Sequence, residues 1–66
     1  MTFAEKLKAK REEKGYTQSE LARMTDLSTV TICQYEQGRK FPRANNLKEI
    51  ARKLNCQPED LRADKE

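Results

Sequence analysis

The chain has 66 residues, enough for a single domain over residues 1–66 with one small core, expected at about 3–62. Its 14 basic and 11 acidic residues leave a net charge of +3, which by itself identifies no partner. Because there is no His and the two Cys match no metal-binding spacing, we expect no metal, no cofactor and no catalytic centre. No apolar run approaches membrane-spanning length and no signal-peptide core is visible, so a cytoplasmic protein is expected.

A first helix is predicted between two terminal signals. Thr2 and Glu5 have the spacing of a capping box, and Gly15 ends the helix after about residue 14. Its inward stripe consists of Phe3, Leu7 and Lys10. Since Lys10 stands at an apolar position, we expect its stem to pack while its ammonium reaches water, at a local cost to stability.

A second helix is predicted to begin at Gln18, because Thr17 and Glu20 form another capping box. It ends at a short break formed by Asp26 and Leu27. Asp tolerates the left-handed backbone that such tight turns often need. The break is short enough to hold two helices close together.

A third helix is predicted from the N-cap Ser28 to the C′ residue Gly38. On a helical wheel, its inner arc consists of Thr31, Ile32, Tyr35 and Glu36. Its outer arc consists of Thr29, Val30, Cys33, Gln34 and Gln37. This outer arc is small and uncharged, which suits side chains that approach base edges in a DNA major groove. Helix pairs with such short turns also occur in proteins that bind no nucleic acid.

The segment after Gly38 is predicted to be a loop, because Pro42 lies within it. Its basic residues are Arg39, Lys40 and Arg43, placed where a phosphate backbone would pass. We expect Phe41 to cover the core, the alternative being a dimer contact.

A fourth helix is predicted from a clean apolar stripe that consists of Ala44, Leu47, Ile50, Ala51 and Leu54. Pro58 suits the first turn of a short fifth helix through Leu61, and residues 63–66 are expected to fray. Cys56 is interpreted as a core thiol. Cys33 is interpreted as a small residue on the outer arc, with a redox switch as the alternative. Five short helices without strands predict an all-α domain.

The pattern resembles the Cro/C1-type helix-turn-helix family, also called the XRE family, from about Leu7 to Leu61. The matching residues are Leu7, Lys8, Arg11, Gly15, Thr17, Gln18, Glu20, Leu21, Ala22, Leu27, Ser28, Ile32, Tyr35, Glu36, Gly38, Pro42, Leu47, Ile50, Ala51, Leu54 and Leu61. The resemblance implies a lambda-repressor-like DNA-binding domain with its helix-turn-helix at helices 2 and 3, and a bacterial or phage origin. Two positions depart from the family: Asp26 replaces the usual Gly of the turn, and Lys10 replaces an apolar residue.

Candidate DNA contacts follow from the outer arc and the resemblance together. Gln34 aligns with a base-reading position of the family, and a Gln amide can pair with adenine. Thr29 and Val30 can present methyl groups to thymine, and Cys33 lies on the same arc. The alternative for a lone Gln is a solvated helix residue.

Backbone contacts are expected at both ends of the helix pair. Gln18 begins its helix, where free N–H groups and the dipole favour an anion, and the resemblance implies the same phosphate role. A second phosphate clamp is expected from Gln37, Arg39 and Lys40 at the far end of the third helix. Arg43 is expected either to contact phosphate or to enter a minor groove, as a basic residue in this loop does in some relatives. The resemblance also implies a structural ion pair between Arg11 and Glu36.

The leading hypothesis is a sequence-specific transcriptional regulator, a repressor that binds a pseudo-palindromic operator as a homodimer. Two half-sites would lie roughly 34 Å apart for one helical turn of DNA. The alternative is a protein-interaction module of the same fold, such as an antitoxin or an adaptor. That alternative predicts larger apolar anchors on the outer arc than Thr29, Val30 and Gln34.

Overall fold

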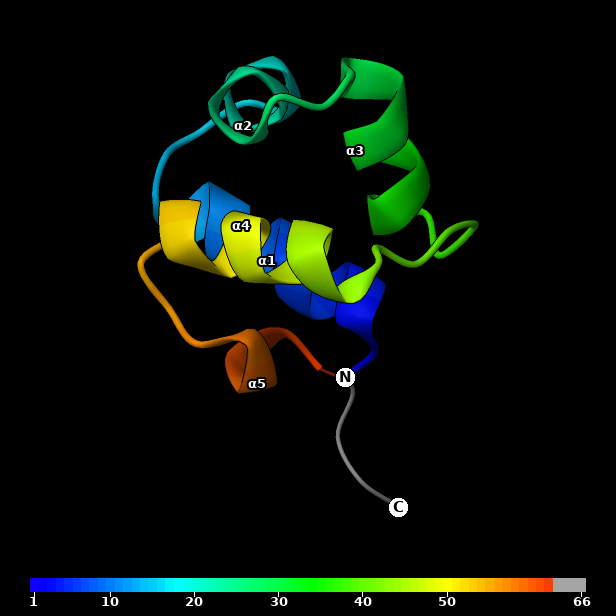
Figure 1. Cartoon of the computed structure of the whole chain (residues 1–66), viewed down its shortest axis with the longest axis vertical. Coiled ribbons are helices and arrows are strands. Elements are labelled where there is room, and N and C mark those ends of the chain that lie inside the picture. The colour runs from blue at the N-terminus through cyan, green and yellow to red at the C-terminus, as the bar shows by residue number, and fades with distance from the viewer. Residues whose placement is uncertain (63–66) are drawn as a thin grey trace.

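The computed structural model describes residues 1–62, which form five helices and no strand (Figure 1). The helices are α1 (Phe3–Glu13), α2 (Gln18–Thr25), α3 (Thr29–Glu36), α4 (Ala44–Lys53) and α5 (Pro58–Leu61). The predicted all-α class and the order of the helices are therefore confirmed. The fraying expected for residues 63–66 falls outside the described residues.

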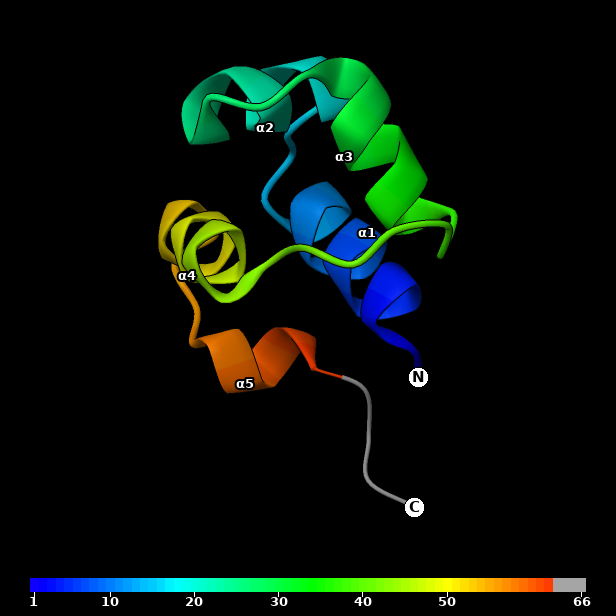
Figure 2. The same ribbon diagram turned by 45° about the vertical axis from the view of Figure 1, so that its right-hand side comes forward.

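The helices are arranged along the long axis of the molecule. Figures 1 and 2 show α2 and α3 at one end, α1 and α4 in the middle, and α5 at the other end. Helix α3 packs against α1 and α2, while α4 packs against α2 and α5. None of the helices among residues 1–62 combines the length and apolar character needed to cross a membrane.

Side-chain caps begin the first three helices, as the sequence predicts. In the first capping box, Glu5 N–H donates to the Thr2 hydroxyl (3.2 Å) and Thr2 N–H donates to the Glu5 carboxylate (2.9 Å). Thr17 and Glu20 repeat this reciprocal pair at 3.0 and 2.7 Å. The Ser28 hydroxyl accepts from the N–H of residue 31 at 3.0 Å. These bonds satisfy N–H groups that a helix start leaves without partners.

The turns between helices use left-handed backbone at four positions. Gly15 (φ 79°) and Gly38 (φ 77°) lie where helix ends are predicted. Asp26 (φ 61°) ends α2 in the left-handed conformation that the sequence predicts. Asn55 (φ 57°), just after α4, was not predicted, although Asn tolerates this region better than most side chains.

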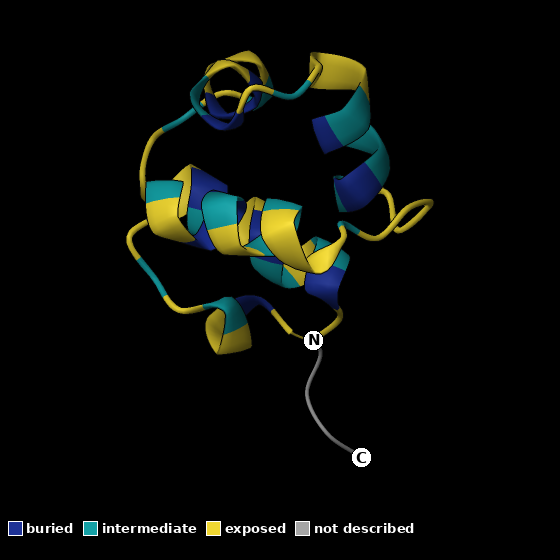
Figure 3. Ribbon diagram, viewed as in Figure 1, coloured by how far each residue is buried: buried dark blue, intermediate teal, exposed yellow. Residues whose placement is uncertain are grey.

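A single core joins the helices. Its buried residues are Phe3, Leu7, Leu21, Ala22, Ile32, Tyr35, Ile50, Ala51, Leu54 and Leu61. The rings of Phe3 and Tyr35 meet edge to face, with centroids 6.4 Å apart. Figure 3 shows that the buried segments of α3 face the centre, whereas its exposed start faces away. The orientation of α3 is therefore set by Ile32 and Tyr35, both of which the sequence places on the inner arc.

Two apolar residues predicted to contact the core are exposed. Phe41 is 73% exposed, so it caps the core from outside and is not buried in it. Its ring lies against Phe3 at a centroid distance of 5.1 Å. Phe3 also packs against Tyr35, so Phe41 covers the outer side of the Phe3–Tyr35 pair. Ala44 is also exposed, because it is the first residue of α4 and the helix meets the core only from Leu47 onward.

Lys10 and both cysteines occupy intermediate positions. Lys10 is half-buried, and its ammonium lies 3.4 Å from the exposed carboxylate of Glu13, as expected for a packed stem with a solvated head. Cys56 is half-buried against the core, and burial raises the pKa of its thiol. Cys33 is half-buried on α3.

Candidate nucleic-acid interface

The outer face of α3 and the start of α2 border one open groove with a volume of about 390 Å³, here called the α3 groove. Its lining consists of Gln18, Thr29, Val30, Cys33, Gln34, Gln37 and Arg39. Each of these seven is a residue that the sequence predicts for base or phosphate contact. The structure thus brings together candidates from α2, α3 and the loop after α3.

The α3 groove is lined by both apolar and polar side chains. Val30 is 65% exposed although it is a large apolar side chain. Cys33 and Gln34 are half-buried, while Thr29 and Gln37 are exposed. Such a surface offers methyl groups and amides, the groups that recognise base edges, without a fixed charge on the outer face of α3.

The start of α3 is tied to α2 by a contact that the sequence analysis missed. The Thr29 hydroxyl donates to the Ser19 hydroxyl at 3.3 Å. Ser19 directly follows Gln18 at the start of α2, but only the crossing of α2 and α3 reveals its contact. The hydroxyl of a predicted base-contacting residue therefore has a partner within the protein.

The basic residues are spread along the loop after α3. Arg39 lines the α3 groove, whereas Lys40 and Arg43 do not. Lys40 borders a neighbouring pocket with Phe3 and Phe41. Arg43 is the exposed N-cap residue of α4, and its side chain makes no capping hydrogen bond there. The predicted phosphate set is therefore split between the groove and the loop beyond it.

Behind the groove, Arg11 of α1 and Glu36 of α3 form a bidentate salt bridge, here called the ion bridge. Arg11 Nε donates to Glu36 Oε2 at 2.7 Å and Nη2 donates to Oε1 at 3.1 Å, while Nη1 donates to the Tyr16 carbonyl at 2.8 Å. The two side chains are only 11% and 4% exposed. Hydrogen bonding to Glu36 raises the pKa of Arg11 despite its burial. The bridge fixes α3 against α1.

Gln18 belongs to both the groove and the ion bridge. Its Nε2 donates to Glu36 Oε1 at 3.0 Å, and its side chain also lines the α3 groove. Helices α1, α2 and α3 thus meet at one carboxylate. Among residues 1–62, no group of three or more acidic or Cys side chains is placed to hold a metal ion.

Comparison with known proteins decides the family. A family model described as "Helix-turn-helix" matches residues 7–61, which is most of the chain. The chain belongs to the Cro/C1-type helix-turn-helix family. It is 31% identical over 58 residues to the HTH-type transcriptional regulator DicA of Escherichia coli K12. That match covers 88% of this chain and 43% of DicA, so the chain spans less than half the length of this relative.

Solved structures share the arrangement of helices. The P22 c2 repressor, crystallised with a synthetic operator, superposes with a TM-score of 0.90 at 29% identity, over 94% of each chain. Hydroxypropylphosphonic acid epoxidase from S. wedmorenis superposes with a TM-score of 0.87 at 27% identity, over 92% of this chain but 32% of the epoxidase. The lambda-repressor-like fold is thereby confirmed, and the fold also occurs as part of a longer enzyme.

Proposed function

We propose that the protein is a transcriptional regulator that binds double-stranded DNA sequence-specifically, with α3 in the major groove. The observation that carries this proposal is the α3 groove, where an uncharged helix face is bordered by the start of α2 and by Arg39. The family and the P22 c2 repressor–operator complex support the same docking mode. Recognition helices of this motif contact bases mainly through their N-terminal residues.

Base contacts are assigned to four residues of α3. Gln34 pairs with adenine through its amide, which donates one hydrogen bond and accepts another. Thr29 and Val30 lie at the exposed start of α3 and offer methyl groups to thymine. Cys33 lies between them and Gln34 in the groove, where only a small side chain allows a close approach to the bases.

Phosphate contacts are assigned to five residues around that face. Gln18 offers its side chain and the N-terminus of α2 to one strand. On the far side the contacts come from Gln37, Arg39, Lys40 and Arg43. Three of these carry positive charge and lie in the loop after α3 or at the start of α4, so they supply affinity and register but little sequence information.

We further infer that the protein represses transcription as a homodimer on a pseudo-palindromic operator. One module of this size buries too little surface against DNA for high specificity. Binding to two half-sites raises that specificity. We assign the dimer contact to α5 and its neighbouring loops. Figure 1 shows α5 at the opposite end of the molecule from α2, so it is free of the proposed DNA surface.

Selection from a random duplex library tests the proposal. The chain is expected to enrich one motif, and its Kd for that motif should rise steeply with salt. Binding that depends on salt but shows no sequence preference would contradict sequence-specific regulation and leave only general DNA binding. Failure to bind any duplex at low salt would favour the protein-interaction alternative.

A further inference from the structure

Glu36 holds the side chain of Gln18, which is assigned above to phosphate contact. Its Oε1 accepts hydrogen bonds from both Arg11 Nη2 (3.1 Å) and Gln18 Nε2 (3.0 Å), and its Oε2 accepts from Arg11 Nε (2.7 Å). We propose that Glu36 is a positioning residue for DNA binding, which fixes the Gln18 amide so that an N–H is presented to phosphate. This inference rests on the proposed function.

The chemistry of the carboxylate determines which way the Gln18 amide points. An ionised carboxylate only accepts hydrogen bonds, so Gln18 must turn its NH₂ group, and not its carbonyl oxygen, toward Glu36. The nitrogen carries two hydrogens, and Glu36 Oε1 uses one of them. The other hydrogen is available to a phosphate oxygen. An amide that rotated by half a turn would present its carbonyl oxygen to the phosphate, and the two acceptors would repel each other.

The bridge to Arg11 makes this arrangement compatible with DNA. A lone carboxylate behind the DNA surface would repel phosphate and would be costly to bury. Arg11 neutralises the charge of Glu36 and occupies both of its oxygens, because its guanidinium donates in a fixed fork. Glu36 therefore orients Gln18 without adding net negative charge to the interface.

Substitution of Glu36 distinguishes its positioning of Gln18 from the effect of its negative charge on DNA binding. Glu36→Gln removes a negative charge, which by itself would strengthen binding to DNA. The positioning role predicts the opposite sign, because the substituted amide has one acceptor oxygen for three donor nitrogens of Arg11 and Gln18, so the bonds that fix Gln18 can no longer all form. Phosphate contacts are independent of sequence, so a mixed-sequence duplex of about 20 base pairs at low salt is a sufficient probe.

A double-mutant cycle with Gln18→Ala provides the decisive comparison. Glu36→Gln is expected to raise Kd about tenfold in the wild-type background and less than about twofold in the Gln18→Ala background, because the orienting effect acts only through the amide. An equal rise in both backgrounds would overturn the proposal and leave Glu36 with a purely structural role. No binding by the wild-type protein would overturn the proposed function as well.

Glu49 supplies the matched control. It is paired with Arg52 at 2.7 Å on α4, with 39% of its side chain exposed, and Glu49→Gln makes the same change in net charge. Its Kd for the duplex is expected to equal that of the wild type or to fall slightly. A rise like that of Glu36→Gln would mean that any such change in charge weakens binding, and the proposal would fail.

An NMR measurement on the free protein tests the orientation without DNA. The side-chain amide protons of Gln18 are expected to exchange more slowly with water than those of exposed Gln57, and Glu36→Gln should remove the difference. Equal exchange of the two amides in the wild-type protein would overturn the proposal even if the protein binds DNA. This readout also holds if Glu36→Gln folds poorly, since the wild-type comparison needs no variant.

Discussion

Gln34 and Arg39 line the same groove, but their replacement is expected to change DNA binding in different ways. Gln34→Ala should relax preference at one base position by about 1–3 kcal/mol, because a bidentate amide contact is lost. Arg39→Ala should weaken binding to every duplex and reduce the slope of log Kd against log salt by about one. Titration of single-base variants of the selected motif at several salt concentrations measures both effects. Unchanged preference in Gln34→Ala would refute its assignment as a base contact.

Arg11 is expected to matter for stability beyond any effect on DNA. Arg11→Met leaves Glu36, whose side chain is 4% exposed, without its charged partner, and such a loss costs about 3 kcal/mol or more. Urea unfolding followed by circular dichroism measures the change. The double variant Arg11→Met/Glu36→Leu should recover most of the stability, because no buried charge is left. A single-variant loss below about 1 kcal/mol would show that the pair is solvated in solution.

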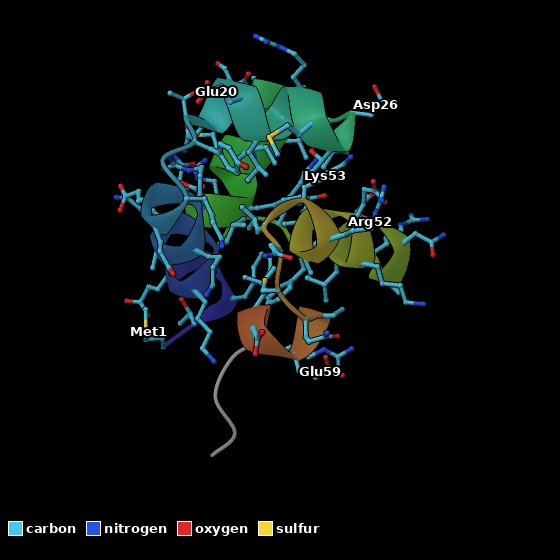
Figure 4. The ribbon with its side chains drawn as sticks, turned by 90° about the vertical axis from the view of Figure 1, so that its left-hand side faces the viewer. Met1, Glu20, Asp26, Arg52, Lys53 and Glu59 are labelled. Atoms are coloured by element: carbon cyan, nitrogen blue, oxygen red, sulfur yellow. The ribbon has the colours of Figure 1, made fainter. Side chains whose placement is uncertain are left out.

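At the scale of helices and turns, Asp26 combines backbone strain with charge. It ends α2 at φ 61°, and Figure 4 shows it at the far end of α2 from Glu20, pointing outward. Asp26→Gly should stabilise the protein by about 0.5 kcal/mol, because the relief of left-handed strain exceeds the entropy that Gly adds to the unfolded chain. Thermal unfolding measures this change.

Asp26→Asn is the matched control for charge. Asn keeps a side chain of the same shape and tolerates left-handed backbone, so little change in stability is expected. If the turn lies near the DNA backbone, both variants should bind duplexes more tightly at low salt and lose this gain at high salt. Unchanged binding by both variants would place the turn away from phosphate.

Helix boundaries were predictable because their signals are local. The hydroxyls of Thr2, Thr17 and Ser28 bond N–H groups three residues ahead, and Gly38 adopts the backbone that Gly favours after a helix. Such contacts need only neighbouring sequence. Asn55 was missed because Asn favours the left-handed region less strongly than Gly, so the residue alone is a weak signal.

Contacts between helices were predictable only in part. The apolar stripe of α4 and the inner arc of α3 indicated which residues face the core, and the residues of the α3 groove follow from the opposite arc. The high exposure of Phe41 could not be predicted, because the route of a loop depends on which surface is still open after the helices pack. The bond from Gln18 to Glu36 could not be read from the sequence, since it depends on how α2 crosses α3.

At the scale of the whole molecule, the proposed DNA surface depends on parts far from it in sequence. Arg11 of α1 is bonded to Glu36 at the end of α3, and Glu36 is in turn bonded to Gln18 of α2. The core residue Tyr35 contacts Phe3 at the start of α1. Because one small core supports all of these contacts, a destabilising change in α1 is expected to weaken DNA binding as well as folding.

A homodimer makes a geometric prediction about its operator. Two inverted half-sites with centres about 10 base pairs apart lie on the same face of DNA, so two chains can bind while touching each other. Binding of the second chain should then be favoured about tenfold or more over binding to an isolated half-site. Electrophoretic mobility shifts with one-site and two-site duplexes measure this cooperativity.

Insertions between the half-sites show whether the chains touch. An insertion of about five base pairs turns the second half-site to the opposite face of the DNA, and an insertion of about ten returns it to the same face but roughly 34 Å further away. Direct contact between small domains cannot bridge either displacement, so both insertions should abolish cooperativity. Equal affinity for one-site and two-site duplexes before any insertion would instead show that the chain binds DNA as an independent monomer.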